Sequence, residues 1–328
     1  MRQWLCTNQV WSHGATVLRG PPNSIPRMSP TITTVRASSA GSEPWTVRRV
    51  LAWVTEHLRS RRFESPGLEA ELLLCHVLDC SRIHLLMDRD RPLADRELAA
   101  YRGLVARRRN HEPTAYLLGV REFYGHVFEV GPSVLIPRPD TETLVEVVLD
   151  RTRDRSMFGR MVDVCTGSGN VAVSFAKERP TWCVVGSDVS SDAIGIASRN
   201  AVRLGVAWNT MFQTGDLLAP VRQHGLFDVI ASNPPYIPTA SIEDLAEEIR
   251  DHEPRLALDG GSDGLDVVRR LVEEAPACLA PDGVLAMEIA CDQGSAVMDW
   301  MGRFGWRELS VIQDLGKRDR VVSGVRPC

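Results

Sequence analysis

After Arg160 the sequence alternates between short apolar runs and longer amphipathic runs, and no other feature constrains its fold as strongly. The short runs predict strands at 161–165, 183–187, 209–213, 226–232, 283–289, 307–312 and 319–325, and the longer runs predict helices at 170–178, 191–204, 264–279 and 293–303. This alternation is typical of a mostly parallel sheet with helices on both faces. The last two strands leave no room for a helix between them, so we expect them to pair antiparallel. The sequence therefore predicts an α/β fold with a seven-stranded, Rossmann-like sheet.

A small helical domain is predicted before the sheet, over residues 43–115. Apolar residues recur at three- and four-residue steps in 46–59, and similar patterns occur in 68–78 and 95–110. The last of these helices ends in three consecutive arginines, Arg107 to Arg109. We interpret them as a solvated final turn that is favoured by the helix dipole, with contact to RNA as the less favoured alternative.

Residues 116–135 are predicted to form a β-hairpin linker, because 123–130 alternates around Gly125-His126. The following segment is stiff and extended, since residues before proline avoid the α region. Asp140 or Thr141 is then expected to cap a helix that runs to Leu149. The sheet domain is expected to cover residues 136–328.

The first 42 residues hold four Arg, eleven Ser or Thr and no acidic residue, and they show no sustained apolar period. We interpret them as a disordered extension, or as translation from a start upstream of the true one. An organellar transit peptide is the alternative, because Arg and Ser without acids is its usual composition. A secretory signal is not expected, since no apolar stretch follows the basic start.

Composition excludes several classes of protein. The chain is 44% hydrophobic and 24% charged, as in an ordinary globular protein, and no window approaches 18 uninterrupted apolar residues. Its eight cysteines include no C-x-x-C pair, so neither a disulfide framework nor a zinc or other metal site is expected. We expect a cytoplasmic protein with no membrane association.

Charge is divided unevenly along the chain. Residues 116–328 hold 21 basic and 31 acidic residues, a net charge of −10. A domain that grips nucleic acid through its phosphates usually carries a basic surface. We therefore expect no direct, specific binding of nucleic acid.

A strand, a glycine-containing turn and a helix follow one another in residues 161–170. Glycines at such a turn let the backbone approach a ligand and place a helix N-terminus beside it. The full G-x-G-x-x-G spacing is absent, and glycines between a strand and a helix often only turn the chain. This signal is weak by itself.

Acidic residues end three successive predicted strands. Asp163 and Asp188 close the first two, and Asp216 follows the third. A carboxylate at the position of Asp188 can accept both ribose hydroxyls of a nucleoside, and Asp216 could meet an adenine amino group. The set indicates an adenosine ligand without a pyrophosphate, and so favours S-adenosylmethionine over NAD. For each acid taken separately, a purely structural role is about as plausible.

The most informative segment is Asn233-Pro-Pro-Tyr236, which follows an apolar strand at the sheet edge where ligands bind. The Asn233 side-chain oxygen and the Pro234 carbonyl can each accept one N–H of an –NH2 group. Proline stiffness fixes that carbonyl, and the Tyr236 ring can pack on a planar amide or base. The segment therefore suits methylation of a planar nitrogen. The alternative is a Pro-Pro loop capped by an asparagine.

At these residues the chain resembles the HemK-type protein-(glutamine N5) methyltransferases that modify peptide chain release factors. The resemblance covers residues from about 45 to 325. It rests on Tyr116-Leu-Leu-Gly119, Arg121-Glu-Phe-Tyr-Gly125, Leu135-Ile-Pro-Arg-Pro-Asp-Thr-Glu142, Asn233-Pro-Pro-Tyr236, and Glu253-Pro-Arg-Leu-Ala-Leu258 followed by Gly260 and Gly261.

The resemblance implies a class I methyltransferase domain preceded by a helical domain that docks the release factor. It implies catalytic roles for Asn233, Pro234 and Tyr236, with the substrate glutamine held at Asn233, Pro234, Pro235 and Tyr236. It also implies S-adenosylmethionine contacts at Cys165, Thr166, Gly167, Ser168, Gly169, Asp188, Asp216, Leu217 and Asn233. Two departures stand out: Cys165 replaces the first glycine of the family's loop, and Glu288-Ile-Ala290 replaces its glutamate-histidine-glycine.

The function expected is methyl transfer from S-adenosylmethionine to the glutamine side chain of a release factor's Gly-Gly-Gln loop, by a monomeric enzyme. A ribosomal-protein glutamine methyltransferase is chemically identical, and only the Pro-Arg-Pro-Asp sequence disfavours it. A nucleic-acid N6-adenine or N4-cytosine methyltransferase would use the same tetrapeptide on a flipped base. The acidic charge and the lack of a target-recognition domain disfavour that alternative. A non-catalytic binding module is disfavoured by the intact tetrapeptide.

Overall fold

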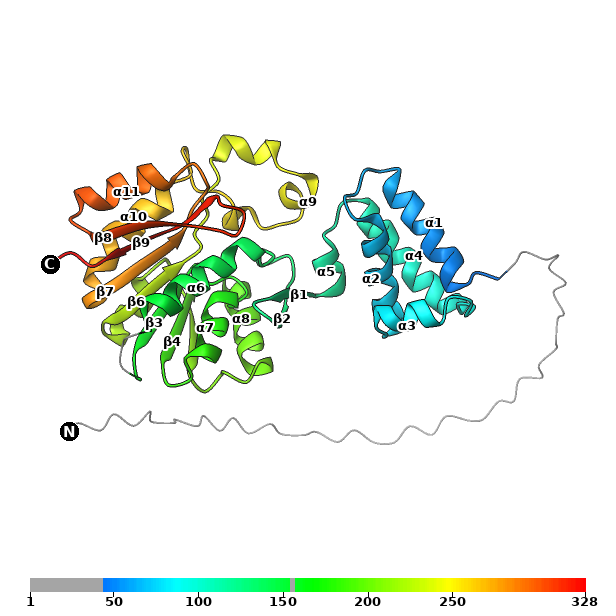
Figure 1. Cartoon of the computed structure of the whole chain (residues 1–328), viewed down its shortest axis with the longest axis horizontal. Helices are drawn as coiled ribbons and strands as arrows, with labels where there is room; N and C mark the ends of the chain where they lie inside the picture. Colours follow the sequence, from blue (N-terminus) through cyan, green and yellow to red (C-terminus); the bar gives the residue numbers. More distant parts are fainter. Residues whose placement is uncertain (1–43, 154–156) are drawn as a thin grey trace, which may run out of the picture. The chain divides into compact units, whose positions relative to one another are not determined.

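The computed structural model describes residues 44–153 and 157–328 (Figure 1). The predictions for residues 1–42 lie outside this part of the chain. Within it, the elements follow the predicted order: helices first, then a hairpin, then a sheet with alternating helices.

The helical part contains the three predicted helices and two shorter ones. Their bounds are α1 Val47–Arg59, α2 Pro66–Leu78, α3 Arg82–Met87, α4 Asp95–Arg109 and α5 Thr114–Leu118. The short helices α3 and α5 were not predicted, because one or two turns leave no readable apolar period. Buried leucine and valine side chains of α1, α2 and α4 form one core. Tyr101 is buried among them and donates a hydrogen bond from its hydroxyl to the Ala70 carbonyl at 2.9 Å.

The interpretation of Arg107 to Arg109 as a solvated turn is wrong for Arg108. Its side chain is only 2% exposed, its guanidinium lies 4.2 Å from the Phe63 ring centroid, and it pairs with Glu69 and Glu248. The helical period explains the burial, because Arg108 is seven residues after the buried Tyr101 and so shares its face. A cation at such a position needs the two carboxylates as partners.

The hairpin consists of β1 Val120–Phe123 and β2 His126–Glu129, which pair antiparallel. The prediction of a hairpin is confirmed, with its turn one residue earlier than expected, at Tyr124-Gly125. Both turn residues have positive φ, 49° and 71°, as a tight hairpin with the twist of the flanking strands requires. The buried Asn200 holds the end of this hairpin, donating to the Glu129 and Ser168 carbonyls and accepting from the Glu129 N–H.

The predicted sheet is confirmed, with strand order β5-β4-β3-β6-β7-β9-β8. The first five strands in this order are parallel, and β9 is antiparallel to both of its neighbours, β7 and β8. The strands are β3 Arg160–Val164, β4 Cys183–Asp188, β5 Thr210–Thr214, β6 Phe227–Ser232, β7 Leu279–Glu288, β8 Arg307–Gln313 and β9 Asp319–Val325.

Helices cover both faces of this sheet (Figure 1). One buried cluster joins the sheet to α6 and α7, and another joins its opposite face to α10 and α11. The helices are α6 Glu142–Arg151, α7 Asn170–Glu178, α8 Ser191–Arg203, α9 Glu247–Arg250, α10 Asp266–Glu274 and α11 Gly294–Arg303. No helix in residues 44–153 or 157–328 is long and apolar enough to cross a membrane.

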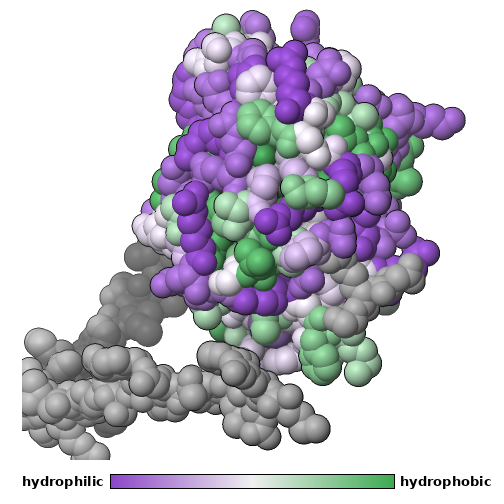
Figure 2. All heavy atoms as spheres, turned by 90° about the vertical axis from the view of Figure 1, so that its left-hand side faces the viewer, coloured by the Kyte–Doolittle hydropathy of each residue, from purple (hydrophilic) through white to green (hydrophobic). Residues whose placement is uncertain are grey.

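On the face shown in Figure 2, hydrophobic residues are interspersed among hydrophilic ones. Scattered exposed apolar side chains are normal for a folded protein and need no binding partner to explain them. The carboxyl edge of the sheet is more informative, because chemically distinctive residues gather there.

Candidate active site

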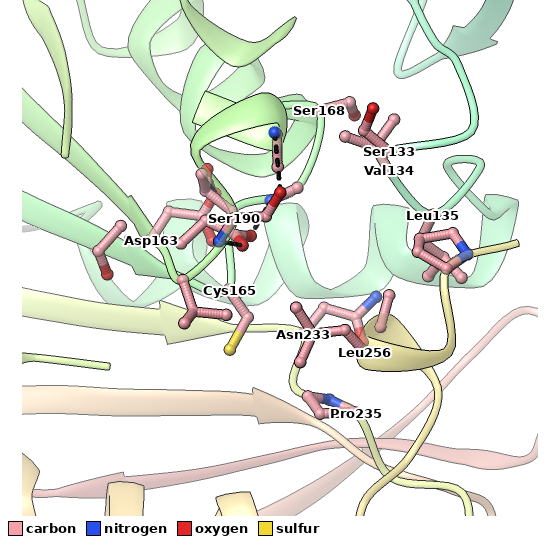
Figure 3. A pocket seen from close by; sticks show the side chains of 18 of the residues that line it. Ser133, Val134, Leu135, Asp163, Cys165, Ser168, Ser190, Asn233, Pro235 and Leu256 are labelled. Carbon is pink, nitrogen blue, oxygen red and sulfur yellow. Dashed lines mark hydrogen bonds between the residues drawn. The ribbon is translucent and has the colours of Figure 1, made fainter. Parts of the chain in front are cut away.

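The carboxyl ends of β5, β4, β3 and β6 open into one pocket of about 550 Å³. These four strands are direct neighbours in the sheet. Their carboxyl ends therefore bring together residues that are spread over positions 163 to 235 of the chain. Figure 3 shows Asp163, Cys165 and Ser190 along one side of the pocket and Leu135 on the other, with Asn233, Pro235 and Leu256 close together. The pocket thus unites the loop residues 165–168, the strand-end acids, and Asn233 and Pro235 of the tetrapeptide. Three predicted site residues do not line it: Gly169, Pro234 and Tyr236.

Asp163 holds the glycine loop in shape. Its Oδ2 accepts a hydrogen bond from the Thr166 hydroxyl at 2.6 Å and another from the Ala172 backbone N–H at 3.1 Å. Complete burial raises the pKa of Asp163 to about 7, although these two hydrogen bonds oppose the shift. Asp163 therefore ties the loop to the first turn of α7.

The loop itself turns on three residues with positive φ: Cys165 at 59°, Gly167 at 54° and Gly169 at 77°. Cys165 thus adopts a left-handed conformation that glycine takes without strain. Burial raises the pKa of the Cys165 thiol, so it stays protonated and is a poor nucleophile. Cys165, which stands where the family has a glycine, therefore still forms the turn of the loop.

Asp188 lies at the end of β4 and faces the loop. Its Oδ2 accepts from the Gly167 N–H and its Oδ1 accepts from the Ser190 N–H, each at 2.9 Å. Burial raises the pKa of Asp188, and the backbone hydrogen bonds counteract the shift. Each oxygen keeps lone-pair capacity toward the pocket, which a ribose diol could use.

Asp188→Ala is expected to weaken S-adenosylmethionine binding by roughly 1.5–3 kcal/mol, because a charge-assisted pair of hydrogen bonds is lost. Isothermal titration calorimetry measures the effect. Asp192→Ala removes an equal charge from the rim of the same pocket and is the matched control, with a smaller expected loss. Unchanged affinity in Asp188→Ala would remove this residue from the binding site.

Asp216 and Leu217 line the pocket after β5. The Asp216 carboxylate is held by the Arg270 guanidinium through contacts of 2.6 and 3.2 Å. Arg270 lines the same pocket, and sequence reasoning missed it, because α10 lies 54 residues further along the chain and carries no motif. An adenine amino group near Asp216 would share that carboxylate with Arg270.

The tetrapeptide after β6 is anchored through its backbone. Gln293 donates from Nε2 to the Tyr236 carbonyl at 3.0 Å. The next residue, Ile237, pairs with the segment that contains Leu258 and Gly260 through hydrogen bonds of 3.0 and 2.8 Å. The segment that carries the resemblance at 253–261 therefore supports the tetrapeptide.

Two residues behind the tetrapeptide were missed by sequence reasoning. Thr141 Oγ1 accepts a hydrogen bond from Asn233 Nδ2 at 3.3 Å, and Glu288 Oε1 accepts one from the Tyr236 hydroxyl at 3.2 Å. Glu288 is only 1% exposed, and burial raises its pKa to about 7. The available signals were the place of Thr141 inside the Pro-Arg-Pro-Asp-Thr segment and that of Glu288 at the end of β7, next to β6.

The segment 138–142 contacts several parts of the chain. Arg138 pairs with the buried Glu253, Asp140 pairs with Arg320, and Glu142 accepts from the Tyr124 backbone N–H at 2.9 Å. The segment 138–142 is therefore bonded to two other segments that carry the resemblance, 121–125 and 253–258.

Glu288→Gln is expected to change the pH dependence of stability. The pKa of Glu288 is higher in the folded protein than in the unfolded chain. Its contribution to the free energy of unfolding is therefore complete below pH 4.5, and it is lost as the pH rises to about 7. The free energy of unfolding should therefore fall less in the variant than in the wild type between pH 4.5 and 8, by about 3 kcal/mol. Denaturant unfolding at both pH values measures it. Parallel curves for the two proteins would contradict the expectation.

The pocket fits S-adenosylmethionine in size and in chemistry. It offers carboxylates for hydroxyl and amino groups, the apolar surfaces of Leu217 and Val189, and backbone from a glycine loop before a helix. The Asn233 amide lies in the same pocket. This arrangement can hold an adenosine-containing methyl donor beside acceptors for a planar –NH2 group.

Comparison with known proteins agrees with this geometry. Two family models match the chain, "PrmC N-terminal domain" over residues 49–119 and "Methyltransferase small domain" over residues 139–262. A Geobacter sulfurreducens protein named release factor glutamine methyltransferase is 46% identical over 282 residues, covering 86% of this chain and 97% of that protein. A protein of the same name from Nitratidesulfovibrio vulgaris is 39% identical over 279 residues, covering 84% and 94%.

Among solved structures, the hMettl16 catalytic domain in complex with MAT2A 3′UTR hairpin 6 has a TM-score of 0.52 to this chain. The match covers 66% of this chain and 83% of that one, at 13% identity. It reflects a shared fold.

Proposed function

Because this chain belongs to the release factor glutamine methyltransferases, we propose that it methylates the side-chain amide nitrogen of the glutamine in the Gly-Gly-Gln loop of peptide chain release factors. The enzyme uses S-adenosylmethionine, which supplies an electrophilic methyl group. We assign its binding to the loop 165–169, Asp188, Asp216 and Leu217, and the helical part to docking of the release factor.

The Asn233 amide, which lines the pocket, carries the proposal, and the carbonyl of the neighbouring, buried Pro234 is proposed as a second acceptor. Among the described residues, none donates a hydrogen bond to Asn233 Oδ1 or to the Pro234 carbonyl. Neither oxygen is therefore engaged by a donor within the described part of the chain. A primary amide has two N–H groups and needs two acceptors in its plane, which these atoms supply.

In this mechanism the residues of the chain position the amide. Asn233 Oδ1 and the Pro234 carbonyl each take one N–H, which directs the nitrogen lone pair toward the methyl group. The Tyr236 hydroxyl donates to Glu288 and its carbonyl accepts from Gln293, so these two bonds fix the segment that carries Asn233. Once methylated, the nitrogen is acidic and loses one of the two held protons to water. The catalytic gain comes from orientation and electrostatics.

The proposal is tested with the full chain, labelled S-adenosylmethionine and purified release factor. Mass spectrometry should find one methyl group on the loop glutamine, and a release factor with Gln→Ala at that position is the blank. Ribosomal protein and DNA are offered in parallel reactions. Label on ribosomal protein alone would make that glutamine the substrate, and label on DNA alone would overturn the assignment.

A further inference from the structure

Polar contacts join the helical part to a loop of the sheet domain, and Arg108 makes the most buried of them. Arg108 Nη2 donates to Glu248 Oε1 of α9 at 2.5 Å and to Glu69 Oε1 of α2 at 3.1 Å. The Arg108 side chain is 2% exposed, whereas that of Glu248 is 38% exposed. Because so deeply buried a cation needs carboxylate partners, Arg108 holds α9 against the end of α4.

Two histidine contacts accompany this ion pair. His111 Nε2 lies 2.9 Å from Glu247 Oε2, and His252 Nε2 donates to the Asn110 carbonyl at 2.9 Å. We call these two contacts and the ion pair the α4–α9 junction. Two of its pairs span 140 and 142 residues of the chain, so local sequence order does not bring them together.

The loop that carries α9 begins and ends at the tetrapeptide. It leaves at Ile237 and returns at Asp259, and these two residues form a β-bridge. The Thr239 N–H donates to the Gly261 carbonyl at 2.9 Å, which closes the base of the loop further. Ile237 follows Tyr236 directly, so the loop connects the α4–α9 junction to the tetrapeptide.

The same loop also forms part of the pocket wall. Three of its residues line the pocket: Pro254, Leu256 and Ala257. The buried Glu253 precedes them and accepts from the Ile136 backbone N–H at 3.2 Å. The contacts to the helical part and a wall of the pocket therefore belong to one short segment, residues 247–257.

We propose that Arg108 and Glu248 are positioning residues that hold the helical part, and a release factor docked on it, in a fixed position relative to Asn233. The inference rests on the proposed function, which takes the helical part as the docking surface and Asn233 as the acceptor of the glutamine. Docking at one site raises the effective concentration of the glutamine at the other only if the geometry lets both sites be engaged together. The chain joins the two parts through the hairpin, and the junction is a second connection between them.

Glu248→Ala breaks the ion pair across the junction and leaves Arg108 with its partner Glu69 in α2. We expect kcat/KM for the release factor to fall about tenfold, because the docked glutamine reaches the pocket at a lower effective concentration. Calorimetry should find unchanged affinity for S-adenosylmethionine. His252→Ala removes only an exposed contact of the junction, and it should lower kcat/KM in the same direction by about threefold.

Two further variants separate positioning from loss of charge or of local structure. Glu248→Gln keeps an oxygen that can accept from Arg108, and it should recover most of kcat/KM. Glu243→Ala is the matched control, because Glu243 lies on the same loop and pairs within it with Arg255 at 3.8 Å. It should keep the wild-type kcat/KM. Equal losses in Glu243→Ala and Glu248→Ala, or no recovery in Glu248→Gln, would overturn the inference.

Hydrogen–deuterium exchange of the full chain tests the junction without a release factor. In Glu248→Ala the backbone amides of residues 107–111 and 247–253 should exchange faster than in the wild type, while those of α2 stay unchanged. If the wild type methylates no release factor, the proposed function fails, and this measurement still decides whether the junction holds the two parts. Unchanged exchange in both segments, or faster exchange with wild-type kcat/KM, would contradict the positioning role.

Discussion

Asn233→Ala is expected to lower the rate of glutamine methylation by about a hundredfold or more while leaving S-adenosylmethionine binding largely intact. A preorganised polar contact that acts in the transition state is worth this much in rate. Asn233 lies in the pocket, and its amide is held from behind by Thr141. Single-turnover kinetics with a release factor measures the chemical step, and calorimetry measures cofactor affinity.

Asn233→Asp is the matched control for this prediction. It keeps an acceptor in place, so it should retain more activity than Asn233→Ala if acceptance of the substrate N–H is what matters. A release factor with its loop Gln→Ala gives the background. Wild-type methylation by Asn233→Ala would show that the substrate is held elsewhere.

Gly260→Ala is the second substitution with a large expected effect. A Cβ at this position would lie 2.7 Å from the Pro235 carbonyl oxygen and 2.7 Å from the Gly264 carbonyl oxygen. Both are backbone atoms, so no rotamer change relieves the clash. Gly260 is itself fixed, because its N–H donates to the Ile237 carbonyl at 2.8 Å. The segment that carries Pro235 must therefore move.

The expected result is a loss of roughly 1–3 kcal/mol in the free energy of unfolding, as for other overpacked sites. The methylation rate should fall by about a hundredfold, because small displacements of positioning groups are costly. Gly103→Ala is the control: its Cβ meets nothing within 4 Å, and alanine in the α4 helix should stabilise it. Equal activity of Gly260→Ala and wild type would show that the tetrapeptide tolerates movement.

The sheet could be predicted because its signals are local. Buried parallel strands are short apolar runs, and the helices between them bury one face, so both periods are readable in the sequence. Asp188 and Asn233 could be placed in one pocket for a related reason. The carboxyl ends of neighbouring parallel strands share an edge, so residues at strand ends meet without further information.

The partners of these residues could not be predicted, since they depend on pairing between distant segments. Arg108 belongs to a run of three arginines, and only the face of α4 and the distant Glu248 explain its burial. Glu288 resembles an ordinary strand end until β7 is placed beside β6, where its carboxyl meets Tyr236. No local period carries such information.

The segment 138–142 gives the pocket a high contact order. Its bonds reach back 18 residues to Tyr124 and forward 92 to Asn233, 115 to Glu253 and 178 to Arg318. Each closes a loop whose entropy cost is recovered only when the far segment has folded. We therefore expect this pocket to form late in folding, and to be complete only once the last strand of the sheet has joined it.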